Sequence, residues 1–287
     1  MLRKLINSSR LLYLTRSFGN YVFLYPPQGL GDILFVLSFL SEYKKKLSGK
    51  KVILMIEKKY FGELAQLYEE VDGILLINPK EVFGLNRFYA INILYPLIYD
   101  PLFLPKNILC GVKHSLGLED DEVRPNFPKI FDQEKNRKKR LIISPFATSC
   151  TPCMSNEDWL VIAQLAKRKG FEVFFNAPKG VFDGFECDLL PIKEFLSFCS
   201  ESTHFIGYRS GLCDVVASFT PIKMLIVYPN NRKKSEFNCI KDYDLDPNNK
   251  YLQFCSLKQI FSDRGNIEEF IFDKDSFALF LEDFLNG

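Results

Sequence analysis

Short apolar runs alternate along this chain with segments whose apolar residues recur at helical spacing. Several runs lead into a turn rich in glycine, proline or polar residues, and an amphipathic segment follows. Buried strands that alternate with amphipathic helices are typical of a parallel sheet covered by helices on both faces. The expected strands are 21–25, 51–56, 74–77, 141–144, 172–176, 204–207 and 223–228; the expected helices are 33–46, 61–67, 157–169, 192–200 and 273–285.

A charged segment divides this pattern into two halves. Residues from Asp132 to Arg140 are all polar or charged, and the strand–turn–helix pattern starts again after them. Such a run is usually a solvated surface, so we interpret it as a linker. We predict an α/β protein with two Rossmann-like lobes and a cleft between them. The N-terminal lobe is 1–135 and the C-terminal lobe is 136–272; a final helix, 273–287, could pack back on the N-terminal lobe.

The composition is that of a folded protein. Hydrophobic residues make up 47% of the 287 residues, which is compatible with a full core and argues against disorder. The net charge of +2 does not mark a nucleic-acid binder. The eight cysteines follow no regular framework, and residues 1–16 lack the apolar core of a signal peptide. We therefore expect reduced cysteines and a cytoplasmic location.

Two segments bear on membranes. The longest apolar stretch, Tyr89 to Leu104, is interrupted by prolines and polar residues, and it falls short of the roughly 20 apolar residues of a membrane span. Residues 1–14 mix apolar and basic side chains, as a short amphipathic helix does. That helix could pack on the fold or make peripheral contact with anionic lipid at the inner face of a membrane.

The stretch from Gly207 to Asp214 has the features of a phosphate-binding turn. An apolar pair precedes it and apolar residues at helical spacing follow, which predicts a strand, a tight turn and a helix that begins near Ser210. A helix N-terminus presents N–H groups and the positive end of the dipole. Gly211 lets a ligand approach the backbone, because it has no Cβ. Ser210 could cap the helix or donate to a phosphate oxygen.

Two further turns are expected to face the same cleft, because ligands bind outside the carboxyl ends of the strands in open α/β sheets. They are 26–32 and 144–155. In the first, Asp32 is the best candidate for a catalytic base, since a carboxylate can take the proton of an attacking hydroxyl. It could instead be a helix-capping residue without chemistry. Gln28, Gly29 and Gly31 are assigned to the acceptor side of the site.

Three motifs in order suggest a family. Gly31-Asp32 heads a helix; a strand and a small turn, Leu141 to Thr148, open the second half; and a helix with an early tryptophan, Trp159, follows. Gly207 to Asp214 then precedes an apolar strand that ends near proline. No single motif is specific, but their order resembles the GT-B glycosyltransferases, most nearly the heptosyltransferase-like branch, over most of the chain.

This resemblance implies a metal-independent, inverting transfer of a sugar from a nucleotide-sugar donor to a hydroxyl of a glycan or glycolipid acceptor. The acceptor would belong to a bacterial surface glycan such as capsule or lipopolysaccharide. Asp32 would be the base, and no cofactor or metal would be needed. The implied donor-binding residues are Arg209, Ser210, Gly211, Leu212, Asp214, Ser144 and Thr148.

The chain departs from the family pattern at three positions. Arg209 stands where the family has an acidic residue, and Asp214 stands where it has a histidine. The family's lysine before the tryptophan falls near Glu157 here. Arg209 could replace the lost positive charge by clamping a diphosphate, or it could pair with Asp214.

Other interpretations stay open. The chain could be another nucleotide-dependent α/β enzyme of the epimerase or dehydrogenase type, although no Gly-x-Gly-x-x-Gly follows the first strand. It could also be a catalytically silent binding protein of GT-B shape. Cys150 and Cys153 are interpreted as ordinary loop cysteines, since no second pair completes a zinc site. A structural role is assigned to His204.

Overall fold

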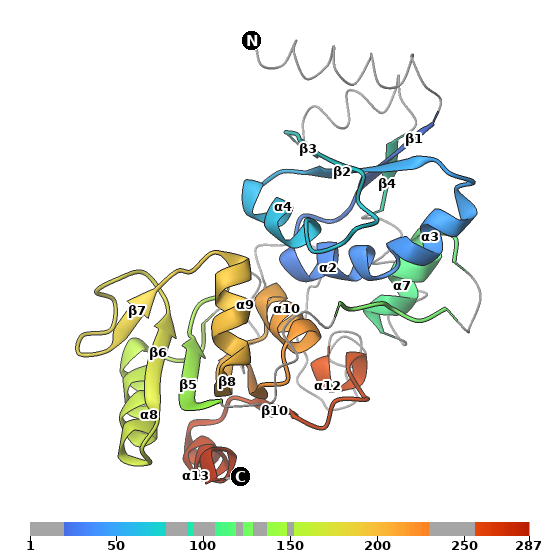
Figure 1. Cartoon of the computed structure of the whole chain (residues 1–287). Helices are drawn as coiled ribbons and strands as arrows, with labels where there is room; N and C mark the ends of the chain where they lie inside the picture. The colour runs from blue at the N-terminus through green and yellow to red at the C-terminus, as the bar shows by residue number, and fades with distance from the viewer. Residues whose placement is uncertain are drawn as a thin grey trace. The chain divides into compact units, whose positions relative to one another are not determined.

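A computed structural model of the chain describes residues 20–78, 91–94, 107–118, 123–128, 137–147, 152–229 and 256–286 (Figure 1). Two compact units divide near residue 128, a few positions before the predicted lobe boundary. The predicted N-terminal helix, most of the 89–104 stretch, residues 132–136 of the predicted linker, and Thr148 and Cys150 lie outside the described residues.

The N-terminal unit contains four parallel strands in the order β3-β2-β1-β4 within the described residues. Its strands are β1 (Tyr21–Tyr25), β2 (Lys51–Ile56), β3 (Gly73–Leu76) and β4 (Ile91–Ile93), and its helices are α2 (Leu30–Ser38), α3 (Leu40–Lys46), α4 (Lys59–Ala65) and α7 (Ile108–Ser115). Every residue of β2 after its first lysine is buried, as an apolar run in a covered parallel sheet should be. The single predicted helix 33–46 is two helices that meet at Phe39.

The described part of the C-terminal unit contains six parallel strands in the order β10-β9-β8-β5-β6-β7. The strands are β5 (Lys138–Ser144), β6 (Glu172–Asn176), β7 (Glu186–Asp188), β8 (Ser202–Tyr208), β9 (Lys223–Tyr228) and β10 (Ile267–Ile271). The helices are α8 (Asn156–Arg168), α9 (Ile192–Ser200), α10 (Gly211–Phe219), α12 (Leu257–Ile260) and α13 (Lys274–Asn286). Numbered within the unit, this is the 3-2-1-4-5-6 order of the Rossmann fold, which confirms the predicted α/β class.

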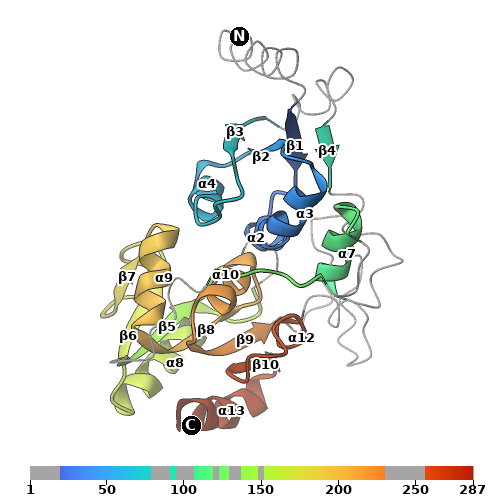
Figure 2. The same cartoon turned by 45° about the vertical axis from the view of Figure 1, so that its right-hand side comes forward.

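Helices cover both faces of this sheet (Figure 2). Trp159 and Ile162 of α8 share one buried cluster with Leu281 and Phe284 of α13 and with apolar residues of the central strands. The sequence allowed the final helix to pack back on the N-terminal lobe. In the structure its apolar face packs against the sheet of the C-terminal unit.

The predicted linker overlaps the first strand of the second unit. Lys138 to Arg140 belong to β5, and Arg140 is buried. Its guanidinium donates to Glu172 on β6 from Nε at 3.1 Å and Nη2 at 2.9 Å, and it lies 4.2 Å from the centroid of the Phe198 ring. The basic run is therefore not solvated throughout. Lys138 and Lys139 are exposed, whereas Arg140 is buried, because a neighbouring strand and an aromatic ring receive its charge.

The helices of the described residues include none that is both long enough and apolar enough to cross a membrane.

We expect His204 to make the protein less stable in mild acid. Its ring packs edge-on against Phe171 and Phe284, with centroids 4.9 and 5.2 Å away. Burial, helped by the charge of Lys223, lowers the pKa of His204 from 6.5 to about 4. Between these values the unfolded chain binds more protons than the folded one, so stability falls as the pH falls through this window.

The measurement is the thermal unfolding midpoint at pH 7 and at pH 5, for the wild type and for His204→Phe. Phenylalanine binds no proton and suits the aromatic neighbours, so the variant should lose less of its midpoint on acidification. An equal loss in both proteins would assign the acid sensitivity to other groups.

Candidate functional site

In each sheet the chain first adds strands on one side of its first strand and then adds the next ones on the other side. In the N-terminal unit β1 lies between β2 and β4, and in the C-terminal unit β5 lies between β6 and β8. Ligands of open α/β sheets bind outside the carboxyl ends of the strands at such switch points. The predicted turns follow β1, β5 and β8, so each of them begins at a switch point of its own unit.

The turns after β5 and β8 are held side by side. Ser144, the last residue of β5, is in register with Gly207 of β8. A Cβ on Gly207 would lie 2.9 Å from the carbonyl oxygen of Ser144, closer than such atoms approach in proteins. Glycine at 207 therefore permits this spacing. Ser144, Arg209, Ser210, Gly211 and Leu212 are brought to one edge of the sheet.

Helix α10 begins at the switch point. Ser210 is its N-cap, with extended backbone angles, but its hydroxyl makes no capping hydrogen bond. The hydroxyl oxygen lies 3.6 Å from the sulfur of Cys213. The N–H groups of Gly211 and Leu212 belong to the first turn, where a helix offers no acceptor. The turn thus offers backbone N–H groups, a hydroxyl and the positive end of a helix dipole to an anion.

Arg209 and Asp214 form a buried ion pair across the first turn of α10. Nη1 donates to Oδ2 at 2.9 Å, and Nη2 lies 2.8 Å from Oδ1. The two side chains are only 13% and 4% exposed. Nη1 also donates to the carbonyl of Ser210 at 2.9 Å. Of the two alternatives for Arg209, the structure shows the pairing with Asp214. The two residues that depart from the family motif therefore contact each other.

Aromatic residues support this turn from within the core. Trp159 of α8 packs edge-on against Tyr208, with centroids 5.2 Å apart. The Tyr208 hydroxyl accepts from the backbone N–H groups of Cys153 and Met154, at 3.0 and 2.6 Å. Tyr208 therefore ties the segment before α8 to the end of β8. The tryptophan of the motif contributes to the core behind the site.

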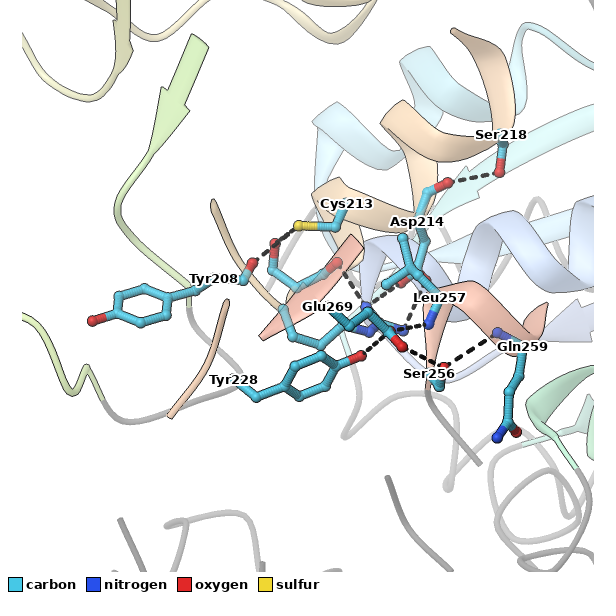
Figure 3. Close-up of polar contacts among 11 residues, drawn as sticks. Tyr208, Cys213, Asp214, Ser218, Tyr228, Ser256, Leu257, Gln259 and Glu269 are labelled. Atoms are coloured by element: carbon cyan, nitrogen blue, oxygen red, sulfur yellow. Dashed lines mark hydrogen bonds and ion pairs between the residues drawn. The ribbon is translucent and has the colours of Figure 1, made fainter. Parts of the chain in front are cut away.

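Two further polar groups lie near this turn, Glu269 on β10 and Cys213 on α10 (Figure 3). Glu269 of β10 accepts from the Tyr228 hydroxyl at 2.6 Å, the Ser256 hydroxyl at 2.7 Å and the Leu257 N–H at 2.7 Å. This carboxylate joins the middle of β10 and the end of β9 to the start of α12. Cys213 donates to the carbonyl of Tyr208 at 3.0 Å, and burial raises the pKa of its thiol to about 11. Cys213 is therefore a buried structural thiol.

In the N-terminal unit, Asp32 lies half-buried in the first turn of α2, whose N-cap is Gly29. A Cβ on Gly29 would lie 2.3 Å from Oδ2 of Asp32. The carboxylate therefore folds back over Gly29, and any other residue at 29 would displace it. Gly31 is buried in the same turn of the helix.

Gln28 connects the ends of β1 and β2. Its amide donates to the carbonyl of Pro26 at 2.7 Å and accepts from the N–H of Glu57 at 2.8 Å. The Tyr25 hydroxyl donates to Oε1 of Glu57 in a short hydrogen bond. Gln28 therefore fixes the turn in which the sequence placed it. Glu57 was missed by the sequence reasoning, although a polar residue directly after a buried strand is a usable signal.

The described residues contain no group of three or more histidine, cysteine, aspartate or glutamate side chains that could hold a metal ion. Cys153 is half-buried and reduced, whereas Cys150 lies outside the described residues.

We expect Asp214→Asn to lower the free energy of unfolding by about 3 kcal/mol, because it removes the carboxylate that pairs with the buried Arg209 guanidinium. Urea unfolding can be followed through the fluorescence of Trp159, the only tryptophan. Lys179→Gln is the control. Lys179 pairs with Asp188 at 3.2 Å but is 77% exposed, so its loss should cost less than about 1 kcal/mol.

The double variant Arg209→Met/Asp214→Leu removes both charges and should recover most of that loss. If Asp214→Asn costs no more than Lys179→Gln, the pair does not hold the turn.

Comparison with known proteins gives a likeness of fold. No protein-family model matches the chain, and a search of curated proteins found no match. The solved structure of Escherichia coli heptosyltransferase WaaC with ADP matches 92% of this chain and 99% of its own, with a TM-score of 0.59 and 10% identity. A family 9 glycosyl transferase from Veillonella parvula DSM 2008 matches with a TM-score of 0.52 and 12% identity, covering 91% of this chain and 88% of its own.

A third structure is longer. TibC from enterotoxigenic E. coli H10407, described as an iron-containing dodecameric glycosyltransferase, has a TM-score of 0.52 and 19% identity. The match covers 72% of this chain and 57% of TibC, so this chain spans less than three fifths of that protein. These structural neighbours are glycosyltransferases. The chain therefore has the fold of the heptosyltransferase-like GT-B proteins, built from two Rossmann-like lobes.

Proposed function

We propose that this chain is a metal-independent, inverting glycosyltransferase. It would move a sugar from a nucleotide-sugar to a hydroxyl of a bacterial surface glycan. The observation that carries this proposal is the switch point of the C-terminal lobe, where the N-terminus of α10 begins beside the carboxyl end of β5. The likeness to heptosyltransferases solved with ADP or with ADP-heptose supports a nucleotide-sugar as the donor.

The donor's diphosphate would bind at the start of α10. The N–H groups of Gly211 and Leu212 and the hydroxyl of Ser210 would supply donors, and Ser144 would assist from the end of β5. Because Arg209 is already paired with Asp214, the helix N-terminus carries more of the phosphate charge than a side-chain clamp would. In this proposal the ion pair holds the phosphate-binding turn in place.

Asp32 would act as the general base. As the acceptor hydroxyl attacks the anomeric carbon, the carboxylate takes its proton, and the bond from that carbon to the diphosphate oxygen breaks on the opposite face. A single displacement of this kind inverts the configuration. The turn of Gln28, Gly29 and Gly31 would form the acceptor side, with Gln28 holding the backbone and Gly29 leaving room for the Asp32 carboxylate.

The glycan or glycolipid acceptor, and action in the cytoplasm at the inner face of the membrane, rest on the family resemblance alone.

Nucleotide binding is the first test. A ligand that binds only the folded protein raises its unfolding temperature. We expect the midpoint to rise with at least one of ADP, UDP, GDP, ADP-heptose or UDP-glucose. If all of these leave it unchanged at millimolar concentration, the transferase proposal loses its main support.

Asp32→Asn tests the chemistry. It should lower turnover by about 10²-fold or more and leave donor affinity unchanged, because the amide cannot accept the proton. Gly29→Ala should also lower turnover, since its Cβ displaces the Asp32 carboxylate. The readout is nucleoside diphosphate released from the donor that shifts the midpoint.

Gly62→Ala is the matched glycine control. A Cβ at 62 would meet its nearest neighbours at 3.6 Å, an ordinary contact, so turnover should stay at the wild-type level. Full turnover in Asp32→Asn would remove Asp32 from the role of base.

A further inference from the structure

An aromatic ring is exposed beside the proposed donor site. Phe146 follows Ser144 and Pro145 at the carboxyl end of β5, and it is 46% exposed. Among the large hydrophobic residues that the described ranges leave exposed, Phe146 is the only aromatic one. This phenylalanine lies in a turn where a ligand is expected. A ligand that covered its apolar surface would gain binding free energy from the burial.

The ring is held from behind by two others. Phe146 stacks on Phe182 with centroids 6.2 Å apart and the rings inclined by 30°. Phe182 stacks on Phe175 of β6 at 4.0 Å and 13°, and both of these rings are fully buried. Three rings thus run from the core to the surface. The outermost ring is supported on its inner side and presents apolar surface to the solvent.

The position of this ring points to the nucleoside part of a ligand. β5, β6 and β7 form the first half of the Rossmann order, and Phe182 lies between β6 and β7. In the Rossmann fold the pyrophosphate lies at the helix after the first strand, and a side chain near the end of the second strand binds the ribose. Here the phosphate-binding turn follows the fourth strand of the unit, β8, on the other side of β5, and a nucleoside that crosses the switch point from there would extend toward the end of the second strand. That second strand is β6. Its last residue, Asn176, donates to the Ser144 hydroxyl at 3.3 Å, which ties the ends of β5 and β6 together.

We propose that Phe146 stacks on the nucleobase of the donor. This inference rests on the proposed function and deepens it, because it assigns recognition of the base to a residue outside the phosphate-binding turn. A planar base covers an aromatic face by offset stacking. Stacking tolerates different bases, so Phe146 contributes affinity, while hydrogen bonds elsewhere choose the base.

The test compares nucleotides with pyrophosphate by calorimetric titration. The proteins are the wild type, Phe146→Ala and Phe146→Tyr; the probes are ADP, UDP, GDP and inorganic pyrophosphate. Phe146→Ala should weaken the nucleotide that binds the wild type by about 5- to 150-fold, the range that one base stack on an aromatic side chain provides. Pyrophosphate affinity should stay the same, and Phe146→Tyr should bind the nucleotide as the wild type does.

Leu279→Ala is the control, since Leu279 on α13 is 73% exposed and belongs to the same lobe. It should bind all probes as the wild type does. An unchanged nucleotide affinity in Phe146→Ala would overturn this inference and leave the proposed function standing. An equal loss of nucleotide and pyrophosphate would also overturn it, because the variant would then have disturbed the phosphate turn. If no probe binds the wild type, the proposed function fails and this inference fails with it.

Discussion

The close approach of β8 to β5 at Gly207 is the constraint on which the site depends. With no Cβ at 207, the backbone at the end of β8 can lie against the carbonyl of Ser144. The turns after the two strands then start from neighbouring points, and α10 begins where the sheet changes direction. A side chain at 207 would push the strands apart and separate the two turns.

The charges of the site are arranged differently from the motif that it resembles. A base at 209 and an acid at 214 replace an acid and a histidine, and they neutralise each other in a buried pair. Such a pair contributes little net free energy compared with an apolar pair, but the loss of one partner is costly. The stabilities that residues 209 and 214 confer are therefore coupled. A substitution that removes one charge destabilises the fold less when the other charge is removed as well. The backbone of α10 then provides the attraction for an anion.

Prediction from the sequence worked where the pattern was long and local. The strands 51–56, 172–176 and 223–228 and the helix 192–200 have the bounds that were expected. The strands β4, β7 and β10 and the helices α7 and α12 were missed. β4, β7 and α12 are only three or four residues long, too few to establish a period. The linker was extended into β5 because four consecutive basic residues, Arg137 to Arg140, suggest solvent, whereas Glu172 and Phe198 receive Arg140 within the fold.

The sequence by itself determined the α/β class, the presence of two lobes, and the turns that carry Asp32 and Ser210. These follow from hydrophobic periods and turn residues, which are properties of neighbours in the chain. Only the tertiary structure decided the strand order, the pairing of Arg209 with Asp214, the lobe on which α13 packs, and the exposure of Phe146. The physical reason is that an apolar face must be covered and a buried charge must be paired. The order of residues along the chain shows that these needs exist, but it does not show which distant residue meets each of them.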